Sequence, residues 1–225
     1  MIGRYAAGLL LLLLSGSCGG GQAAAPAKRP VLHLLTGLPL AFGESFTLDA
    51  PKSPVMAALE REYDVRLVDG PETLPAGGLL LAAQPRALTP ERLVALDRWV
   101  RGGGRLLLLA DPRLTWPSDL PLGDPQRPPY AFSDTGLLAH WGLRSESPAV
   151  GASGTARFPV AGREVESDSA GRLSRSAGPC RVAVDERSAD CRIGRGRALV
   201  VADADFLRMR GGAEASVALL GTLIR

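Results

Sequence analysis

Four aspartates could carry chemistry in this 225-residue chain, because each follows closely after a short apolar run. Two carboxylates held together can act as a general acid and a general base when their surroundings move their pKa values apart. The same oxygens can instead bind a cation, a sugar or a basic peptide, or cap the next helix or turn. Capping is the simplest role, because the four have no fixed spacing and no neighbouring histidine that would suggest a metal. The four residues are Asp69, Asp111, Asp203 and Asp205.

Other groups that commonly carry chemistry are poorly placed. His33 lies in the middle of an apolar run, where a histidine usually packs in the core, and His140 lies on a short helical segment. The sequence contains no Gly-x-Ser-x-Gly elbow. Glycines 102–104 lead from a predicted helix to a strand, whereas a phosphate loop leads from a strand to a helix. We therefore expect no nucleophilic catalysis, no cofactor and no metal site.

Alternating apolar and amphipathic segments supply the elements that would hold these aspartates. The helix expected at 90–101 has the clearest limits, with Thr89 as its N-cap and Gly102 at its end. This alternation predicts an α/β fold with a mostly parallel sheet and helices on both faces. Because parallel strands end at one edge, Thr36 and the four aspartates are expected at a single ligand-facing crevice there. Further helices are expected at 54–63, 137–141 and 214–225, and strands at 31–36, 65–68, 78–83, 105–110 and 197–202.

Two irregular regions follow the fourth of these strands. Residues 113–134 are rich in proline and lack periodicity, so they predict a long ordered loop that could roof the crevice. Segments 156–160 and 163–167 predict a small antiparallel hairpin. Cys180 and Cys191 flank a second hairpin pattern, which would place the two thiols opposite each other. In an exported chain this pattern predicts a disulfide, since two thiols without a nearby histidine cannot fill a zinc site.

Several of these segments resemble a known family. The residues that carry the resemblance are Thr36-Gly37, Leu81 to Pro85, Leu88 to Glu91, Leu96 to Leu108, Asp111-Pro112, 194–197 and 203–205. They resemble the periplasmic domain of auxiliary components of ABC-type transport systems, the GldG-like group of gliding motility. The resemblance implies a flavodoxin-like, class I glutamine amidotransferase-like fold. It also implies loss of that chemistry, because Asp111-Pro112 stands on the turn where such amidotransferases carry their nucleophilic cysteine.

The N-terminus predicts export and a lipid anchor. Residues 1–17 carry Arg4, a short apolar stretch and small residues directly before Cys18, as in a signal peptide followed by a lipobox. Cys18 is therefore expected to receive a diacylglycerol, with plain secretion as the alternative. Residues 18–30 predict a flexible tether, and residues 31–225 a single domain. A lipid would then replace the transmembrane helices typical of the resembled group.

Composition excludes several classes of protein. With 46% hydrophobic residues the chain can bury a core, and its only long apolar run is too short for a membrane span. A net charge of +3 spread over the whole chain does not favour nucleic acid as a partner. The sequence thus predicts a noncatalytic, membrane-tethered periplasmic binding or accessory domain, whose partner is a transporter or another envelope protein. The alternative is a periplasmic hydrolase that uses paired carboxylates such as Asp111 and Asp203.

Overall fold

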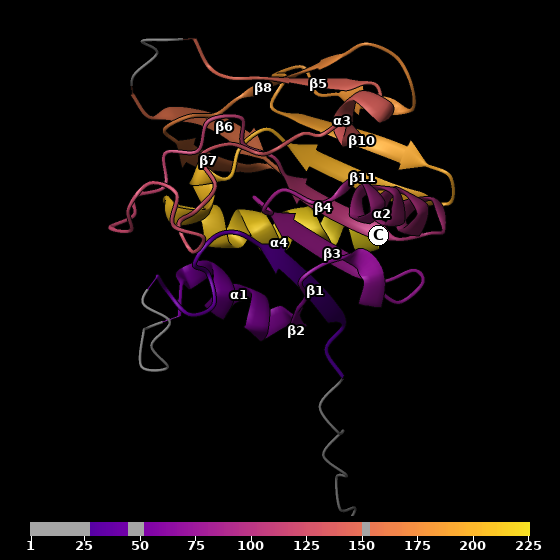
Figure 1. The fold of residues 1–225 in the computed structure, drawn as a ribbon, viewed down its shortest axis with the longest axis horizontal. Coiled ribbons are helices and arrows are strands. Elements are labelled where there is room, and N and C mark those ends of the chain that lie inside the picture. Colours follow the sequence, from indigo (N-terminus) through magenta and orange to yellow (C-terminus); the bar gives the residue numbers. More distant parts are fainter. Residues whose placement is uncertain (1–27, 45–51, 150–153) are drawn as a thin grey trace, which may run out of the picture.

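A seven-stranded sheet forms the centre of the computed structural model, which describes residues 28–44, 52–149 and 154–225 (Figure 1). The first five neighbouring strands are parallel to one another. The sixth strand runs antiparallel to the fifth, and the seventh runs antiparallel to the sixth. The prediction of a mostly parallel α/β sheet is therefore confirmed, and the order 2-1-3-4 of its first strands is that of flavodoxin-like doubly wound folds. In sheet order the strands are β2 (Asp64–Leu67), β1 (Val31–Thr36), β3 (Leu79–Ala83), β4 (Arg105–Leu109), β11 (Gly196–Val201), β10 (Ser188–Ile193) and β9 (Cys180–Val182).

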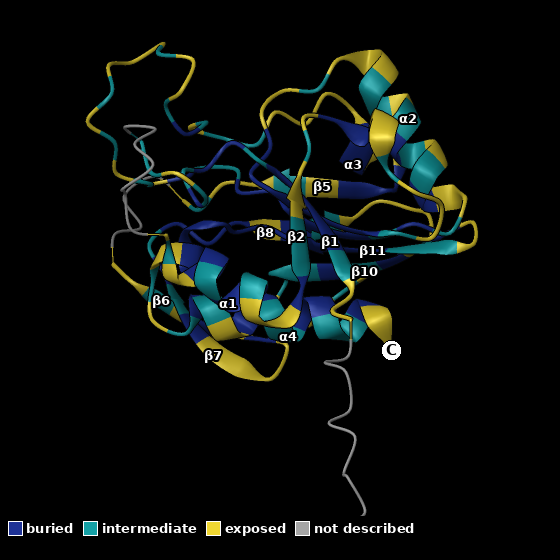
Figure 2. Ribbon diagram, turned by 90° about the horizontal axis from the view of Figure 1, so that it is seen from below, coloured by how far each residue is buried: buried dark blue, intermediate teal, exposed yellow. Residues whose placement is uncertain are grey.

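Helices cover both faces of this sheet, as the pattern predicted. Helices α1 (Pro54–Glu62) and α4 (Gly212–Ile224) lie on one face, and α2 (Pro90–Arg101) and α3 (Leu137–His140) on the other (Figure 2). Strand β4 contributes side chains to the core on both faces of the sheet, because successive side chains of a strand point to opposite faces. Its Leu107 and Leu109 belong to the core under α1 and α4, and its Leu106 and Leu108 to the core under α2 and α3.

The limits of α2 follow from the residues that predicted them. The Thr89 side chain accepts a hydrogen bond from the Arg92 amide at 3.4 Å, and Pro90 occupies the first turn. Gly102 caps the other end, and a Cβ on Gly104 would come within 2.5 Å of the Trp99 ring. The glycine run therefore closes the helix and lets the chain turn tightly into β4.

Two small antiparallel sheets flank the central one. Strands β6 (Ala156–Val160) and β7 (Arg163–Ser167) form the predicted hairpin. Strands β5 (Leu143–Glu146) and β8 (Arg172–Arg175) pair with each other and were not predicted. Each is short and mixes charged with apolar side chains, and the two are far apart in the sequence, so no local pattern revealed their pairing. The remaining elements are the 3-10 turns η1 (Pro71–Thr73) and η2 (Asp205–Arg208).

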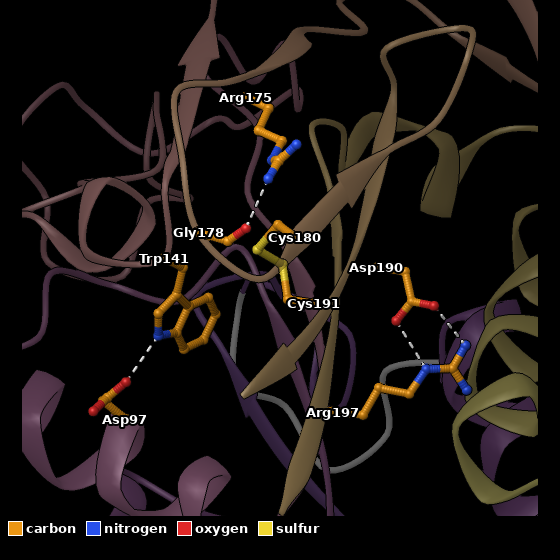
Figure 3. Close-up of a disulfide and its surroundings, with 8 residues drawn as sticks. All are labelled: Asp97, Trp141, Arg175, Gly178, Cys180, Asp190, Cys191 and Arg197. Carbon is orange, nitrogen blue, oxygen red and sulfur yellow. Dashed lines mark hydrogen bonds and ion pairs between the residues drawn. A yellow bond between two sulfur atoms is a disulfide. The ribbon is translucent and has the colours of Figure 1, made fainter. Parts of the chain in front are cut away.

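A disulfide closes the antiparallel side of the sheet (Figure 3). Cys180 of β9 and Cys191 of β10 are directly paired, and their sulfur atoms are 1.99 Å apart. Both lie in the core under α2 and α3. Nearby, the Trp141 indole donates to Asp97 at 2.8 Å and thereby joins the end of α3 to α2. The disulfide thus joins the two cysteines that the hairpin pattern predicted to face each other, and it lies in a packed part of the core.

Within the described ranges, none of the helices has the length and apolarity needed to cross a membrane. The predicted signal peptide (1–17), Cys18 and most of the predicted tether (18–30) lie outside the described residues.

Candidate functional site

Thr36 and the four aspartates predicted to face a ligand all lie at the carboxyl edge of the parallel strands, but the structure divides these five residues into two groups. Asp111, Asp203 and Asp205 are each 0% exposed and form one buried cluster, the acid trio. Thr36 and Asp69 instead line a cavity of about 360 Å³ at the ends of β1 and β2, the switch-point cavity. The expectation of one crevice lined by all of them is therefore wrong. Strand β3 lies between the ends of β1 and β2, which carry Thr36 and Asp69, and the ends of β4 and β11, which carry the acid trio, so the two groups are separated along the edge.

Asp111 uses both carboxylate oxygens to hold backbone amides. One oxygen accepts from the Arg113 amide at 2.8 Å, within the turn that follows β4. The other accepts from the Ala204 amide at 3.1 Å, beyond the end of β11. The side chain thus joins the ends of two neighbouring strands, which is a capping role.

Asp205 joins two further segments to the trio. Its Oδ2 accepts from the Thr115 amide at 2.9 Å, from the Thr115 hydroxyl at 2.6 Å and from the Ser169 hydroxyl. Its Oδ1 lies 3.5 Å from Nε of Arg208 in η2. Thr115 belongs to the proline-rich loop and Ser169 follows β7, so one carboxylate fixes both segments to the sheet edge. No sequence motif marks Thr115, Ser169 or Arg208, and only the Asp-x-Asp spacing at 203–205 pointed to this network.

Asp203 is the least satisfied member of the trio. Its Oδ1 accepts from the Phe206 amide at 3.4 Å, whereas its Oδ2 is buried and has no hydrogen-bond partner among the described residues. Burial and the nearby charge of Asp111 raise the pKa of Asp203 well above its usual value. Burial also raises the pKa of Asp111, to about 6, although its bonds to backbone amides partly oppose this effect. The carboxyl groups of Asp111 and Asp203 therefore keep a proton to higher pH than an exposed aspartate does.

The acid trio is not arranged to bind a metal ion. In the part of the chain that the structure describes, no group of three or more His, Cys, Asp or Glu side chains could hold one. His33 lies in β1 with Nδ1 3.3 Å from the Leu79 carbonyl oxygen, as a core histidine does. His140 is exposed, and its Nε2 lies 3.8 Å from Asp97. The partners of the two histidines, Leu79 at the start of β3 and Asp97 in α2, do not belong to the carboxyl edge of the sheet.

The switch-point cavity lies where the sheet changes winding direction. The chain leaves β1 toward α1 on one face and leaves β3 toward α2 on the other, and ligands of doubly wound folds bind at such a point. The cavity wall comes from the end of β1 and the loop after it, the end of β2, Arg86, and residues 125 and 126 of the proline-rich loop. Thr36 itself is occupied, because its hydroxyl donates to the Ala83 carbonyl at 2.8 Å and accepts from the Leu38 amide at 2.9 Å. It shapes the cavity rather than offering a free hydroxyl.

Gln84, at the end of β3, is held in a strained conformation beside this cavity. Its φ of 44° lies in the left-handed region, which a residue with a Cβ rarely adopts. Its side-chain amide donates to the Asp111 carbonyl at 3.1 Å and accepts from the Asp111 amide at 2.9 Å. Its own carbonyl accepts from the Gly37 amide at 3.1 Å. Reciprocal bonds to two neighbouring strand ends thus fix the turn that presents Arg86, and the sequence contained no signal for them.

The proline-rich loop lies over the same edge, as predicted, and is joined to it at both ends. The Leu114 amide donates to the Tyr130 carbonyl, and the Phe132 amide to the Asp111 carbonyl, both at 2.7 Å. Within this loop lies a second cavity of about 500 Å³, the loop cavity, whose wall includes Trp116, Tyr130 and, from outside the loop, Arg86. Arg86 lines both cavities and donates to the Arg127 carbonyl at 3.1 Å. Arg86 therefore lies between the switch-point cavity and the loop cavity.

Comparison with solved structures identifies the fold. The chain is similar to the exo-β-1,4-mannosidase Op5Man5 from Opitutaceae bacterium strain TAV5, with 13% identity and a TM-score of 0.51 over 85% of this chain and 35% of that one. It is also similar to a catalytic mutant of Gan42B, a GH42 β-galactosidase from G. stearothermophilus, with 16% identity and a TM-score of 0.53 over 88% of this chain and 30% of that one. The chain spans about a third of the length of these enzymes. Such low identity shows a shared fold only.

Comparison at the level of sequence identifies the family. No curated protein matches the chain. The model of an auxiliary family described as "ABC-type uncharacterized transport system" matches residues 29–173, which is more than half of the chain. The matched range contains strands β1 to β4, the switch-point cavity and the proline-rich loop. The chain therefore belongs to this family of auxiliary components of ABC-type transport systems.

Proposed function

We propose that the chain is a noncatalytic accessory domain of an ABC-type transport system, held at the periplasmic side of a bacterial membrane by a lipid on Cys18. Family membership supports the transport role. The observation that carries the noncatalytic role is the complete burial of the acid trio, whose oxygens mostly hold the chain's own backbone. A substrate would have to displace these contacts to reach a carboxylate. The open cavities at the same edge offer binding without chemistry.

The finer relationship to the GldG-like group is part of this proposal. The segment from Leu96 to Leu108, through the end of α2 and into β4, carries the resemblance. A doubly wound sheet with Asp111-Pro112 on the turn after β4 is what an amidotransferase-like domain without its nucleophile would have. Pro112 offers no amide hydrogen to an oxyanion, so the turn also lacks one donor for such chemistry.

A carboxylate-dependent hydrolase is the competing function, and one observation favours it. Asp111 and Asp203 carry raised pKa values, and one Asp203 oxygen is unpaired among the described residues, as in some acid and base pairs. Assays of glycosidase, esterase and glutaminase activity from mildly acidic to mildly basic pH separate the two functions. We expect no turnover by the intact chain. Turnover that disappears in Asp203→Asn but persists in the matched surface variant Glu62→Gln would establish the hydrolase.

The lipid anchor is tested by the chemistry of the mature N-terminus. We expect mass spectrometry of membrane-extracted protein to find a chain that begins at Cys18 and carries diacylglycerol. Cys18→Ser should lose incorporation of labelled fatty acid completely, because serine offers no thiol for the thioether bond. The control Ser17→Ala keeps a small residue before the cysteine and should retain the label. A soluble mature form that begins at Gln22 or Ala23 would contradict the anchor.

A further inference from the structure

We propose that the switch-point cavity binds a small zwitterion, an amino acid or short peptide with a free ammonium and a free carboxylate group. The ammonium would lie at the wall formed by Asp69 and Glu44, and the carboxylate at Arg86. This inference rests on the proposed binding role and names the ligand class of that edge. The three residues all line the same cavity.

The size and lining of the cavity suit such a ligand. Its volume of about 360 Å³ lies at the lower end of the range for small-molecule sites. Leu34, Leu38 and Leu67 contribute apolar surface, against which an aliphatic side chain can pack. Leu67 is 48% exposed and Phe42 is 39% exposed, so apolar surface at the rim is open to solvent. A mostly apolar recess with a few convergent charges is typical of sites for small organic molecules.

The acidic wall has unused negative charge. Asp69 follows β2 and is exposed, and its carboxylate has no hydrogen-bond or ion-pair partner within the described parts of the chain. Glu44 accepts from the Asp119 amide at 3.1 Å through Oε2, whereas its Oε1 has no partner among described residues. Arg92 donates to the backbone carbonyl oxygen of Asp69 at 3.2 Å, but its ion pair is with Glu72. The two carboxylates therefore have no ion-pair partner among the described residues, and this wall suits a positively charged group. An ammonium group can reach the exposed Asp69 directly, while Glu44 adds to the local negative potential.

Arg86 supplies the opposite charge. Its Nη1 donates to the Arg127 carbonyl oxygen at 3.1 Å, and its Nε and Nη2 have no hydrogen-bond partner among the described residues. The bond positions the side chain and leaves other donors for a planar anion, and a guanidinium binds a carboxylate through two parallel bonds. The strained turn at Gln84 holds the backbone two residues before it. The cation is therefore presented by a fixed turn rather than by a loose loop.

The combination of charges distinguishes this ligand class from others. A purely anionic ligand would be attracted by Arg86 but repelled by Asp69 and Glu44. A purely cationic ligand would be attracted by the two carboxylates but repelled by Arg86. A neutral sugar would leave all three charges without a partner. A metal ion is not favoured, because the described residues contain no group of three suitable ligands. A zwitterion satisfies both ends at once.

Calorimetric titration of the intact chain tests this inference with the dipeptide Leu-Leu as the probe. We expect measurable binding of Leu-Leu, and at least tenfold weaker binding of both N-acetyl-Leu-Leu and Leu-Leu-amide. Arg86→Gln should weaken Leu-Leu at least tenfold and remove the preference for the free dipeptide over its amide. Asp69→Asn should remove the preference for the free dipeptide over its acetylated form. Glu62→Gln and Arg98→Gln are matched surface controls and should bind as the unaltered chain does.

The outcomes separate a free zwitterion from the end of a partner chain. Equal binding of the acetylated and free forms would indicate recognition of a protein C-terminus and would overturn the inference. Absence of Leu-Leu binding at millimolar concentration, or variants that behave like the controls, would overturn it as well. Melting temperatures of Arg86→Gln and Asp69→Asn show whether each variant is folded. None of these results affects the lipid on Cys18 or association with a transporter, so the proposed function is judged separately.

Discussion

Asp203→Asn should stabilise the protein at pH 8, by roughly 2 kcal/mol in the free energy of unfolding, as is common when a poorly paired buried charge is removed. The asparagine side chain can still accept from the Phe206 amide through its oxygen. Its NH₂ group would occupy the place of Oδ2, which has no partner among the described residues, and would remove the repulsion between this group and the nearby Asp111 carboxylate. The variant therefore imitates the protonated acid without the cost of keeping a proton there.

The effect should depend on pH with a definite sign. The folded pKa of Asp203 is raised, so above its unfolded value, about 4, the unfolded chain has lost a proton that the folded chain retains. The contribution of Asp203 to the stability of the unaltered protein is thus most favourable below that pH and falls as pH rises toward the folded pKa. An asparagine side chain does not titrate, so the advantage of the variant should be small at pH 4 and grow toward pH 8. Chemical denaturation at several pH values measures it.

Asp111→Asn provides the contrast within the same trio. Both oxygens of Asp111 accept backbone amides, so an NH₂ group at either place would face another donor. This variant should be destabilised by about 1 to 3 kcal/mol, the cost of leaving a buried donor unpaired. If Asp203→Asn destabilises as much as Asp111→Asn at pH 8, the account of a raised Asp203 pKa is wrong.

Loss of the disulfide should lower the free energy of unfolding by roughly 3 kcal/mol and the melting temperature by about 10 °C. The bond closes a segment with a sequence separation of 11 and restricts the unfolded chain. The double variant Cys180→Ala/Cys191→Ala should show this loss in thermal unfolding followed by circular dichroism. The two residues hold β9 against β10, so the antiparallel side of the sheet should loosen first (Figure 3).

Reductant separates the cross-link from side-chain packing. The unaltered chain in excess dithiothreitol keeps both sulfur atoms but loses the bond, and it should melt close to the double variant. The double variant itself should not respond to reductant. An unchanged melting temperature after reduction would show that the bond does not stabilise the fold.

Local signals in the sequence were enough to predict most of the framework. The apolar run at 105–110 predicted β4 because a strand buried on both faces needs apolar residues at nearly every position. Thr89 and Gly102 fixed the ends of α2, because caps depend on neighbouring residues alone. The pairing of Cys180 with Cys191 followed from a hairpin, whose register is also set locally. These predictions were confirmed because each element is determined by residues that are close together in the sequence.

The candidate site depended on contacts between distant segments, and these were not predictable in the same way. Asp69 and Asp111 both follow strands, but one ends in a solvent-exposed cavity and the other beneath a loop. The sequence placed them together because it could not show the order of the strands, in which β1 and β3 lie between β2 and β4. Gln84 has no motif, and its role depends on Asp111, 27 residues later. The acid trio likewise depends on Thr115 and Ser169, which bond to Asp205 from two segments that are distant from it in the sequence.

Co-purification from bacterial membranes tests the central claim most directly. The intact tagged chain would be isolated after mild cross-linking and detergent extraction, and its partners identified by mass spectrometry. We expect the ATPase and permease subunits of one ABC-type transporter, recovered again when the ATPase subunit carries the tag, and retained with Asp203→Asn. A chain that is recovered without any transporter subunit in both directions, and that shows hydrolase turnover lost in Asp203→Asn, would contradict the account.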